Sequence, residues 1–139
     1  MRWAALLILF ALAGCGGAVQ VEPPVPQGPA VAACTRLSGM LPATLDGTPR
    51  GESTPESPYV AVWGEGEIAL RCGVPRPARM APTAQLQEID GVGWFADPDV
   101  PTLFTAVTDT AYVEVTIART HEPGEVLVDL AKPILTATS

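Results

Sequence analysis

The chain begins with a short positive segment and an apolar run, and this start decides which residues remain to fold and in which compartment. Met1 and Arg2 precede ten apolar residues, 3–12, which are followed by the small residues Ala13 and Gly14. Ten residues rise about 15 Å as a helix, roughly half of the ~30 Å hydrocarbon core of a bilayer, so the run is too short for a permanent membrane span. A positive start, a short apolar run and small residues together predict a cleaved signal peptide.

The residues that end this run, Leu12-Ala13-Gly14-Cys15, resemble the lipobox of bacterial lipoproteins. The resemblance implies that residues 1–14 are removed and that Cys15 carries acyl chains such as palmitate. Because one acyl chain binds only marginally, the two or three chains of a lipoprotein cysteine are needed for a lasting anchor. The chain would then be lipid-anchored at the extracytoplasmic side of the cell membrane. The alternative is an ordinary secretory signal that a cysteine follows by chance.

The charge of the chain argues against nucleic acid and against electrostatic docking on a membrane. Without Arg2, seven basic side chains remain against fifteen acidic ones, a formal charge of −8. Such a chain gains nothing from nucleic-acid phosphates and is repelled by anionic lipid head groups. We therefore expect no nucleic-acid partner, and attachment to the membrane through the N-terminal acyl chains alone.

Composition divides the residues after the signal into a linker and one domain. The prolines of residues 15–30 are Pro23, Pro24, Pro26 and Pro29. Proline-rich segments are extended, at about 3 Å per residue, so we expect a semi-rigid spacer that lifts the domain clear of the lipid. Residues 31–139 are enough for one hydrophobic core but not for two.

Two further cysteines, Cys34 and Cys72, are expected to form a disulfide. With Cys15 acylated they are the remaining thiols, and an oxidising compartment favours their pairing. Apolar residues alternate in the strand that ends at Cys72, which places its thiol on the buried face. Cys34, Leu37 and Leu41 lie on one side of a short helix, so its thiol points into the core as well. Two buried free thiols are the alternative.

Short strands punctuated by turn residues account for most of the predicted domain. The expected hairpins join residues 59–63 to 67–72, 86–89 to 92–96, and 103–108 to 111–117. Asp90-Gly91 suits a type I′ turn, which requires positive φ at both central positions. Residues 47–58 form a surface loop.

Near the C-terminus the period of apolar residues becomes helical, and Pro133 should kink or end that helix. The residues that share its apolar face are Leu127, Leu130, Ala131, Ile134 and Leu135. The predicted fold is therefore α+β: an antiparallel sheet of short hairpins with a short N-terminal helix and a C-terminal helix packed on one face.

Several segments together carry a resemblance to a known family. They are Cys34, Leu41-Pro42, Trp63-Gly64, the run from Ile68 to Pro77, Val92-Gly93-Trp94 and Asp129-Leu130. These segments resemble a family of small actinobacterial lipoproteins built on a domain of unknown function, and the Leu-Arg-Cys-Gly-Val-Pro stretch at 70–75 is the most specific part. The resemblance implies an envelope location and the same disulfide, and it supplies no reaction, ligand or catalytic residue.

The sequence contains no recognisable catalytic or metal-binding motif, and we expect no cofactor. His121, the single histidine, lies in a His-Glu-Pro-Gly loop that is expected to be solvated, and no Gly-x-Ser-x-Gly motif accompanies it. Asp90, Asp97 and Asp99 do not have the spacing of an EF-hand and predict a solvated acidic turn. An Asp- or Glu-dependent hydrolase of cell-wall material remains the alternative function, because acids are plentiful and their separation is invisible in sequence.

Five side chains are candidates for a ligand-binding face: Tyr59, Trp63, Arg71, Arg76 and Arg79. If Cys72 faces the core, Arg71 faces the opposite side of the sheet, and the two aromatic residues alternate away from the apolar Val60 and Val62. Arg76 and Arg79 follow in a proline-stiffened segment. Aromatic planes suit sugar rings and arginine suits carboxylates, and cell-wall glycan offers both.

The competing interpretation is that these aromatic side chains pack beneath the loop at 47–58 and that the arginines pair with acids such as Glu65 and Glu67. On balance the sequence predicts a non-catalytic binding or scaffolding module at the outer face of the cytoplasmic membrane. Its expected partner is cell-wall glycan or another envelope protein.

Overall fold

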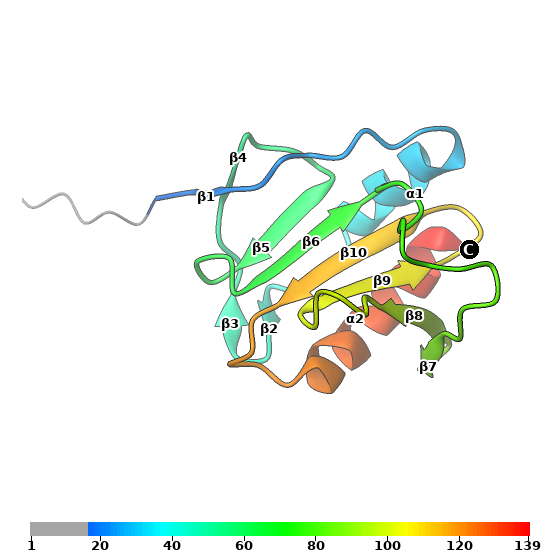
Figure 1. The fold of residues 1–139 in the computed structure, drawn as a ribbon. Helices are drawn as coiled ribbons and strands as arrows, with labels where there is room; N and C mark the ends of the chain where they lie inside the picture. The colour runs from blue at the N-terminus through cyan, green and yellow to red at the C-terminus, as the bar shows by residue number, and fades with distance from the viewer. Residues whose placement is uncertain (1–16) are drawn as a thin grey trace, which may run out of the picture.

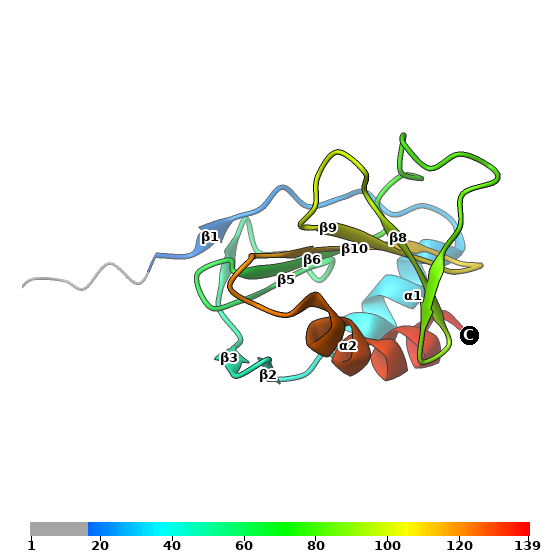
Figure 2. The ribbon, with the colours of Figure 1, turned by 60° about the horizontal axis from the view of Figure 1, so that its bottom comes forward.

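A computed structural model describes residues 17–139 and confirms the predicted α+β fold, an antiparallel sheet with two helices on one face (Figures 1 and 2). The sheet contains β5 (Val60–Trp63), β6 (Ile68–Cys72), β7 (Gln87–Ile89), β8 (Val92–Ala96), β9 (Leu103–Val107) and β10 (Tyr112–Ile117). Across the sheet their order is β5-β6-β10-β9-β8-β7. Helices α1 (Pro29–Ser38) and α2 (Pro123–Thr138) pack against each other on one side of it.

The three predicted hairpins are present as β5–β6, β7–β8 and β9–β10, all antiparallel. Pairing of β6 with β10 joins the first hairpin to the third and places Cys72 opposite Val113. At the β7–β8 turn, Asp90 and Gly91 have φ of 48° and 91°, as the predicted type I′ turn requires.

The hydrophobic core lies between the sheet and the two helices. In β10 the side chains of Val113, Val115 and Ile117 are buried, whereas the intervening residues are partly exposed. Helix α2 continues through Pro133 to Thr138, so the proline does not end it, and Leu135 is 40% exposed rather than part of the buried face.

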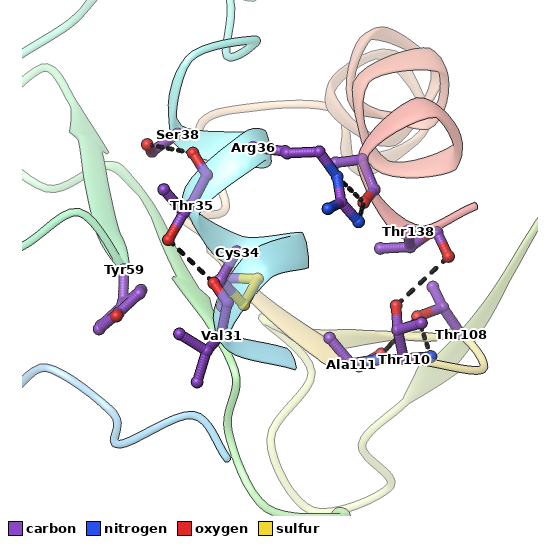
Figure 3. The surroundings of a disulfide bond; sticks show 12 residues. Val31, Cys34, Thr35, Arg36, Ser38, Tyr59, Thr108, Thr110, Ala111 and Thr138 are labelled. Atoms are coloured by element: carbon purple, nitrogen blue, oxygen red, sulfur yellow. Dashed lines mark hydrogen bonds between the residues drawn. A yellow bond between two sulfur atoms is a disulfide. The ribbon is translucent and has the colours of Figure 1, made fainter. Parts of the chain in front are cut away.

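The predicted disulfide between Cys34 and Cys72 is confirmed, and it fastens α1 to the end of β6 (Figure 3). Both cysteines are buried, and their Cα atoms are 5.5 Å apart. Arg36 then ties α1 to α2, because its Nε and Nη2 donate to the carbonyl of Ala137 over 3.1 and 2.8 Å. A cation at this end of α2 also interacts favourably with the helix dipole.

Four two-residue strands lie outside the main sheet: β1 (Val19–Gln20), β2 (Thr44–Leu45), β3 (Thr48–Pro49) and β4 (Ser53–Thr54). Strands β2 and β3 form a small hairpin, and β1 pairs with β4 in parallel. No helix among residues 17–139 combines the length and hydropathy that a membrane span requires.

The segment that the sequence analysis treated as a spacer packs along the domain over residues 19–27 (Figure 1). Arg71 Nε donates to the carbonyl of Glu22 over 3.0 Å, and Pro24 and Pro26 are buried. Pro26 lies so close to Gly73 that a methyl group at Gly73 would overlap with it. The extended conformation expected from the prolines is therefore fixed against the sheet. The predicted signal peptide and Cys15 lie outside the described residues.

Candidate functional site

Trp63 belongs to the hydrophobic core, which corrects the prediction that it lies on an outer ligand-binding face. Its side chain is 0% exposed, and its Nε1 donates to the carbonyl of Pro42 over 3.0 Å. Trp63 pairs with Ile68 across the β5–β6 hairpin, and directly opposed residues share a face of the sheet. The half-buried Tyr59 packs against the same core. Both aromatic side chains are therefore on the helix side of the sheet.

The reason for this error is that β5 is buried on both faces. Val60 and Val62 occupy the face opposite the helices, where they are 7% and 1% exposed. The loop before β5 covers them: Gly51 N donates to the carbonyl of Val62 over 2.9 Å, and Val60 lines a cleft with Glu52 and other residues of that loop. Apolar residues on both faces make the alternation ambiguous, so it could not decide which side faced the helices.

The three candidate arginines lie apart from one another in separate interactions. Arg71 Nη1 pairs with Glu114 Oε1 over 3.0 Å, across β6 and β10. Arg79 Nε pairs with Asp99 Oδ2 over 2.9 Å at the surface. The proposed partners Glu65 and Glu67 take part in neither pair. The predicted face of aromatic and arginine side chains therefore does not form.

Arg76 differs from the other two because backbone carbonyls rather than a carboxylate hold it. Its Nη2 donates to the carbonyls of Met80 and Ala81 over 3.0 and 3.4 Å, and its Nη1 lies 3.5 Å from the hydroxyl of Tyr112. Among residues 17–139, the arginines in ion pairs are Arg71 and Arg79. The carbonyls are neutral, so they orient the Arg76 guanidinium without placing a negative charge beside it.

A groove of about 330 Å³ opens beside Arg76, at the end of the sheet that carries the disulfide. Its lining includes Val25, Ala30, Val74, Arg76 and Tyr112. Val25 is 79% exposed at its edge. The groove thus combines a fixed cation, an aromatic ring and an apolar wall, which suits an anionic group carried on a small organic unit.

His121 is not solvated, contrary to expectation. Its Nδ1 lies 2.8 Å from Asp46 Oδ2, its Nε2 lies 2.7 Å from Glu67 Oε2, and its side chain is 10% exposed. Asp46 belongs to the turn between β2 and β3, and Glu67 directly precedes β6. The sequence does not predict this cluster, because Asp46 and Glu67 are 75 and 54 residues away from His121 and no local pattern connects them.

The carboxylates raise the pKa of His121 above its usual value. The hydrogen bond to Glu67 is the largest cause and that to Asp46 is the next, and burial opposes them. A raised folded-state pKa means that the folded protein holds the proton more tightly than the unfolded chain. The stability that this cluster contributes is therefore fully present below about pH 6.5 and is lost as the pH rises through the raised pKa.

The His121 cluster does not fit the alternative prediction of a paired-carboxylate hydrolase. Such enzymes place two carboxyl groups on either side of a substrate bond. Here the imidazole occupies the space between Asp46 and Glu67, with both carboxylates bound to it. Within the part of the chain that the structure describes, no group of three His, Cys, Asp or Glu residues is arranged to hold a metal ion.

Comparison with known proteins gives one match. A family model described as "Protein of unknown function (DUF3515)" matches residues 5–138. Searches of curated proteins and of solved structures give no match. The family match agrees with the resemblance to a domain of unknown function that the sequence suggested.

Proposed function

The chain belongs to the DUF3515 family of proteins of unknown function, and we propose that it is an envelope lipoprotein whose domain binds a partner without catalysing a reaction. The Leu-Ala-Gly-Cys junction at residues 12–15 supports cleavage before Cys15 and acylation of its thiol. The buried disulfide is consistent with a domain that folds in an oxidising compartment. The protein would then stand at the outer face of the cytoplasmic membrane.

A labelling experiment tests the anchor. Cells that express the wild-type chain should incorporate a palmitate analogue into the protein, and Cys15→Ser should abolish that incorporation. Labelling that persists in Cys15→Ser contradicts the anchor.

The binding site that we propose is the groove beside Arg76, and its ligand is a carboxylate-bearing unit of cell-wall glycan. The observation that carries this assignment is the Arg76 guanidinium, which lines the groove and is held there by backbone carbonyls rather than by a carboxylate. Because Nη2 already donates to Met80 and Ala81, a ligand carboxylate would accept a charge-assisted hydrogen bond from Nη1, and the adjacent Tyr112 ring offers a surface for a sugar. The volume of about 330 Å³ lies near the lower limit of small-ligand sites, roughly 300–1,000 Å³, so one or two sugar units fit it better than a long chain.

Retention on purified cell wall tests this site. The measurement is made at about 0.15 M salt, where repulsion from the net charge of the protein is screened beyond about 8 Å. Arg76→Ala should weaken retention about 10- to 100-fold, because it removes a charge-assisted bond of roughly 1.5–3 kcal/mol. Tyr112→Ala should weaken it too, through loss of the ring.

Arg79→Ala is the matched control, since it also truncates an arginine, at a position three residues after Arg76. Arg79 is already paired with Asp99, so its loss should leave retention unchanged. Thermal unfolding of each variant shows whether the fold persists. A wild-type domain that does not bind cell wall, or equal losses for Arg76→Ala and Arg79→Ala, would refute the groove as the site.

A further inference from the structure

The N-terminal segment enters the domain at Val19, next to the turn between β5 and β6. Val19 N donates to the carbonyl of Glu52 over 2.8 Å, and Val21 N donates to that of Thr54 over 3.2 Å. A methyl group built on Gly66, in the β5–β6 turn, would lie 3.0 Å from Val19 Cγ1. The segment is therefore fixed at this end of the sheet, which is at the left in Figure 1.

Four peptide units separate Cys15 from Val19, and a fully extended chain advances at most about 3.6 Å per residue. A lipid-bearing Cys15 therefore holds Val19 within about 14 Å of its own position. A free spacer over residues 15–30 would instead reach about 45 Å at ~3 Å per residue and would leave the orientation of the domain unrestricted.

We propose that the end of the sheet formed by residues 64–67, the β2–β3 turn and the loop at 118–122 is a surface that faces the lipid head groups. This inference rests on the proposed acylation of Cys15. The three segments are joined to one another: Ala118 N donates to the carbonyl of Glu67 over 2.7 Å, and His121 links Glu67 to Asp46. These hydrogen bonds join the three segments into one surface, and Val19, which lies against Gly66 in it, is within about 14 Å of the anchor.

The chemistry of this surface fits head groups and not the hydrocarbon core. Among the described residues, the exposed large apolar side chains are Val25, Val31, Met40, Leu86, Val100, Val128 and Leu135, and none of them belongs to these three segments. Its exposed side chains include Asp46, Glu65, Glu67 and Glu122 beside Arg119, so zwitterionic head groups fit it better than anionic ones. A polar surface without an apolar anchor rests on the head groups and does not insert.

This orientation directs the groove away from the membrane. Tyr112, which lines the groove, begins β10, and Ile117 ends β10 beside the β5–β6 turn. From Tyr112 to Ile117 the strand advances five residue steps, about 17 Å, so with β10 pointing toward the membrane the groove lies about 17 Å farther from the lipid than the membrane-facing end. The groove would therefore open toward the cell wall.

Fluorescence quenching in vesicles tests the orientation. Two variants of the lipidated protein, Glu65→Cys and Asp109→Cys, each carry one fluorophore on the new cysteine. Glu65 lies in the β5–β6 turn, and Asp109 lies in the β9–β10 turn at the opposite end of the sheet. The vesicles are phosphatidylcholine with a fraction of lipid that carries a head-group nitroxide. Quenching should be several-fold stronger at Glu65 than at Asp109. Equal quenching at the two positions overturns the proposal.

A longer tether provides the control. A flexible insert of about 20 Gly and Ser residues between Gly17 and Ala18 has a mean reach of roughly 25 Å and should abolish the difference between the two labels. The mass of the N-terminal peptide is measured on the same samples. Absence of acyl chains on Cys15 refutes the anchor and this surface together, whereas acylated protein with equal quenching refutes the surface alone.

Discussion

Trp63→Ala is expected to destabilise the domain strongly, because the structure places this side chain in the core. A buried tryptophan removes about 150–250 Å² from water, and truncation of a buried Phe or Trp to Ala costs about 3–5 kcal/mol. The lost hydrogen bond from Nε1 to the carbonyl of Pro42 adds roughly 1 kcal/mol. We expect a total of about 4–6 kcal/mol, against about 5–15 kcal/mol for the whole stability of a domain of this size.

Urea unfolding, followed by circular dichroism, measures this loss. With a slope of about 1–3 kcal/mol per molar urea, a loss of about 4–6 kcal/mol should lower the midpoint by at least about 1.3 M. Trp63→Phe is the matched control, since it keeps an aromatic ring and should cost only about 1–2 kcal/mol. A Trp63→Ala variant that unfolds within about 0.5 M of the wild-type midpoint would refute the placement of this side chain in the core.

Three further predictions concern other parts of the domain. Alanine at both Cys34 and Cys72 removes a cross-link over 38 residues and should lower the free energy of unfolding by about 4 kcal/mol, measured by urea unfolding; an unchanged midpoint contradicts this. His121→Gln should reduce thermal stability more at about pH 5 than at about pH 9, because the raised pKa makes the imidazolium the stabilising form, and equal losses at both pH values would be evidence against it. Gly73→Ala should cost about 1–3 kcal/mol through its overlap with Pro26 and a φ of 90°, and should speed protease cleavage of the N-terminal segment; a wild-type cleavage rate would show that the segment does not depend on this contact.

The sequence predicted the parts of the fold that local patterns determine. The hairpins follow from strand alternation and turn residues, and Asp90-Gly91 adopts the expected positive φ values. The disulfide followed from two cysteines with inward-facing positions. Strand β5 was the exception: Val60 and Val62 are as apolar as a core face, but the loop before the strand covers them. Alternation shows that two faces exist, and only tertiary packing shows which face meets the helices.

The candidate site was harder to predict, because its parts come from segments that are distant in sequence. Nothing near His121 indicates that Asp46 and Glu67 would meet it. The groove likewise needs Val25 from the N-terminal segment, Arg76 from the loop after β6 and Tyr112 from β10. The prolines indicated an extended segment, but the contact of Pro26 with Gly73 that fixes it could not be read from composition.

The most direct test of a lipid-anchored binding domain is the mass of the N-terminal peptide of the protein extracted from its own membranes. We expect this peptide to begin at Cys15 and to carry the mass of two or three acyl chains on that residue. A peptide that retains residues 1–14, or an unmodified Cys15 at the N-terminus, would contradict the proposed anchor.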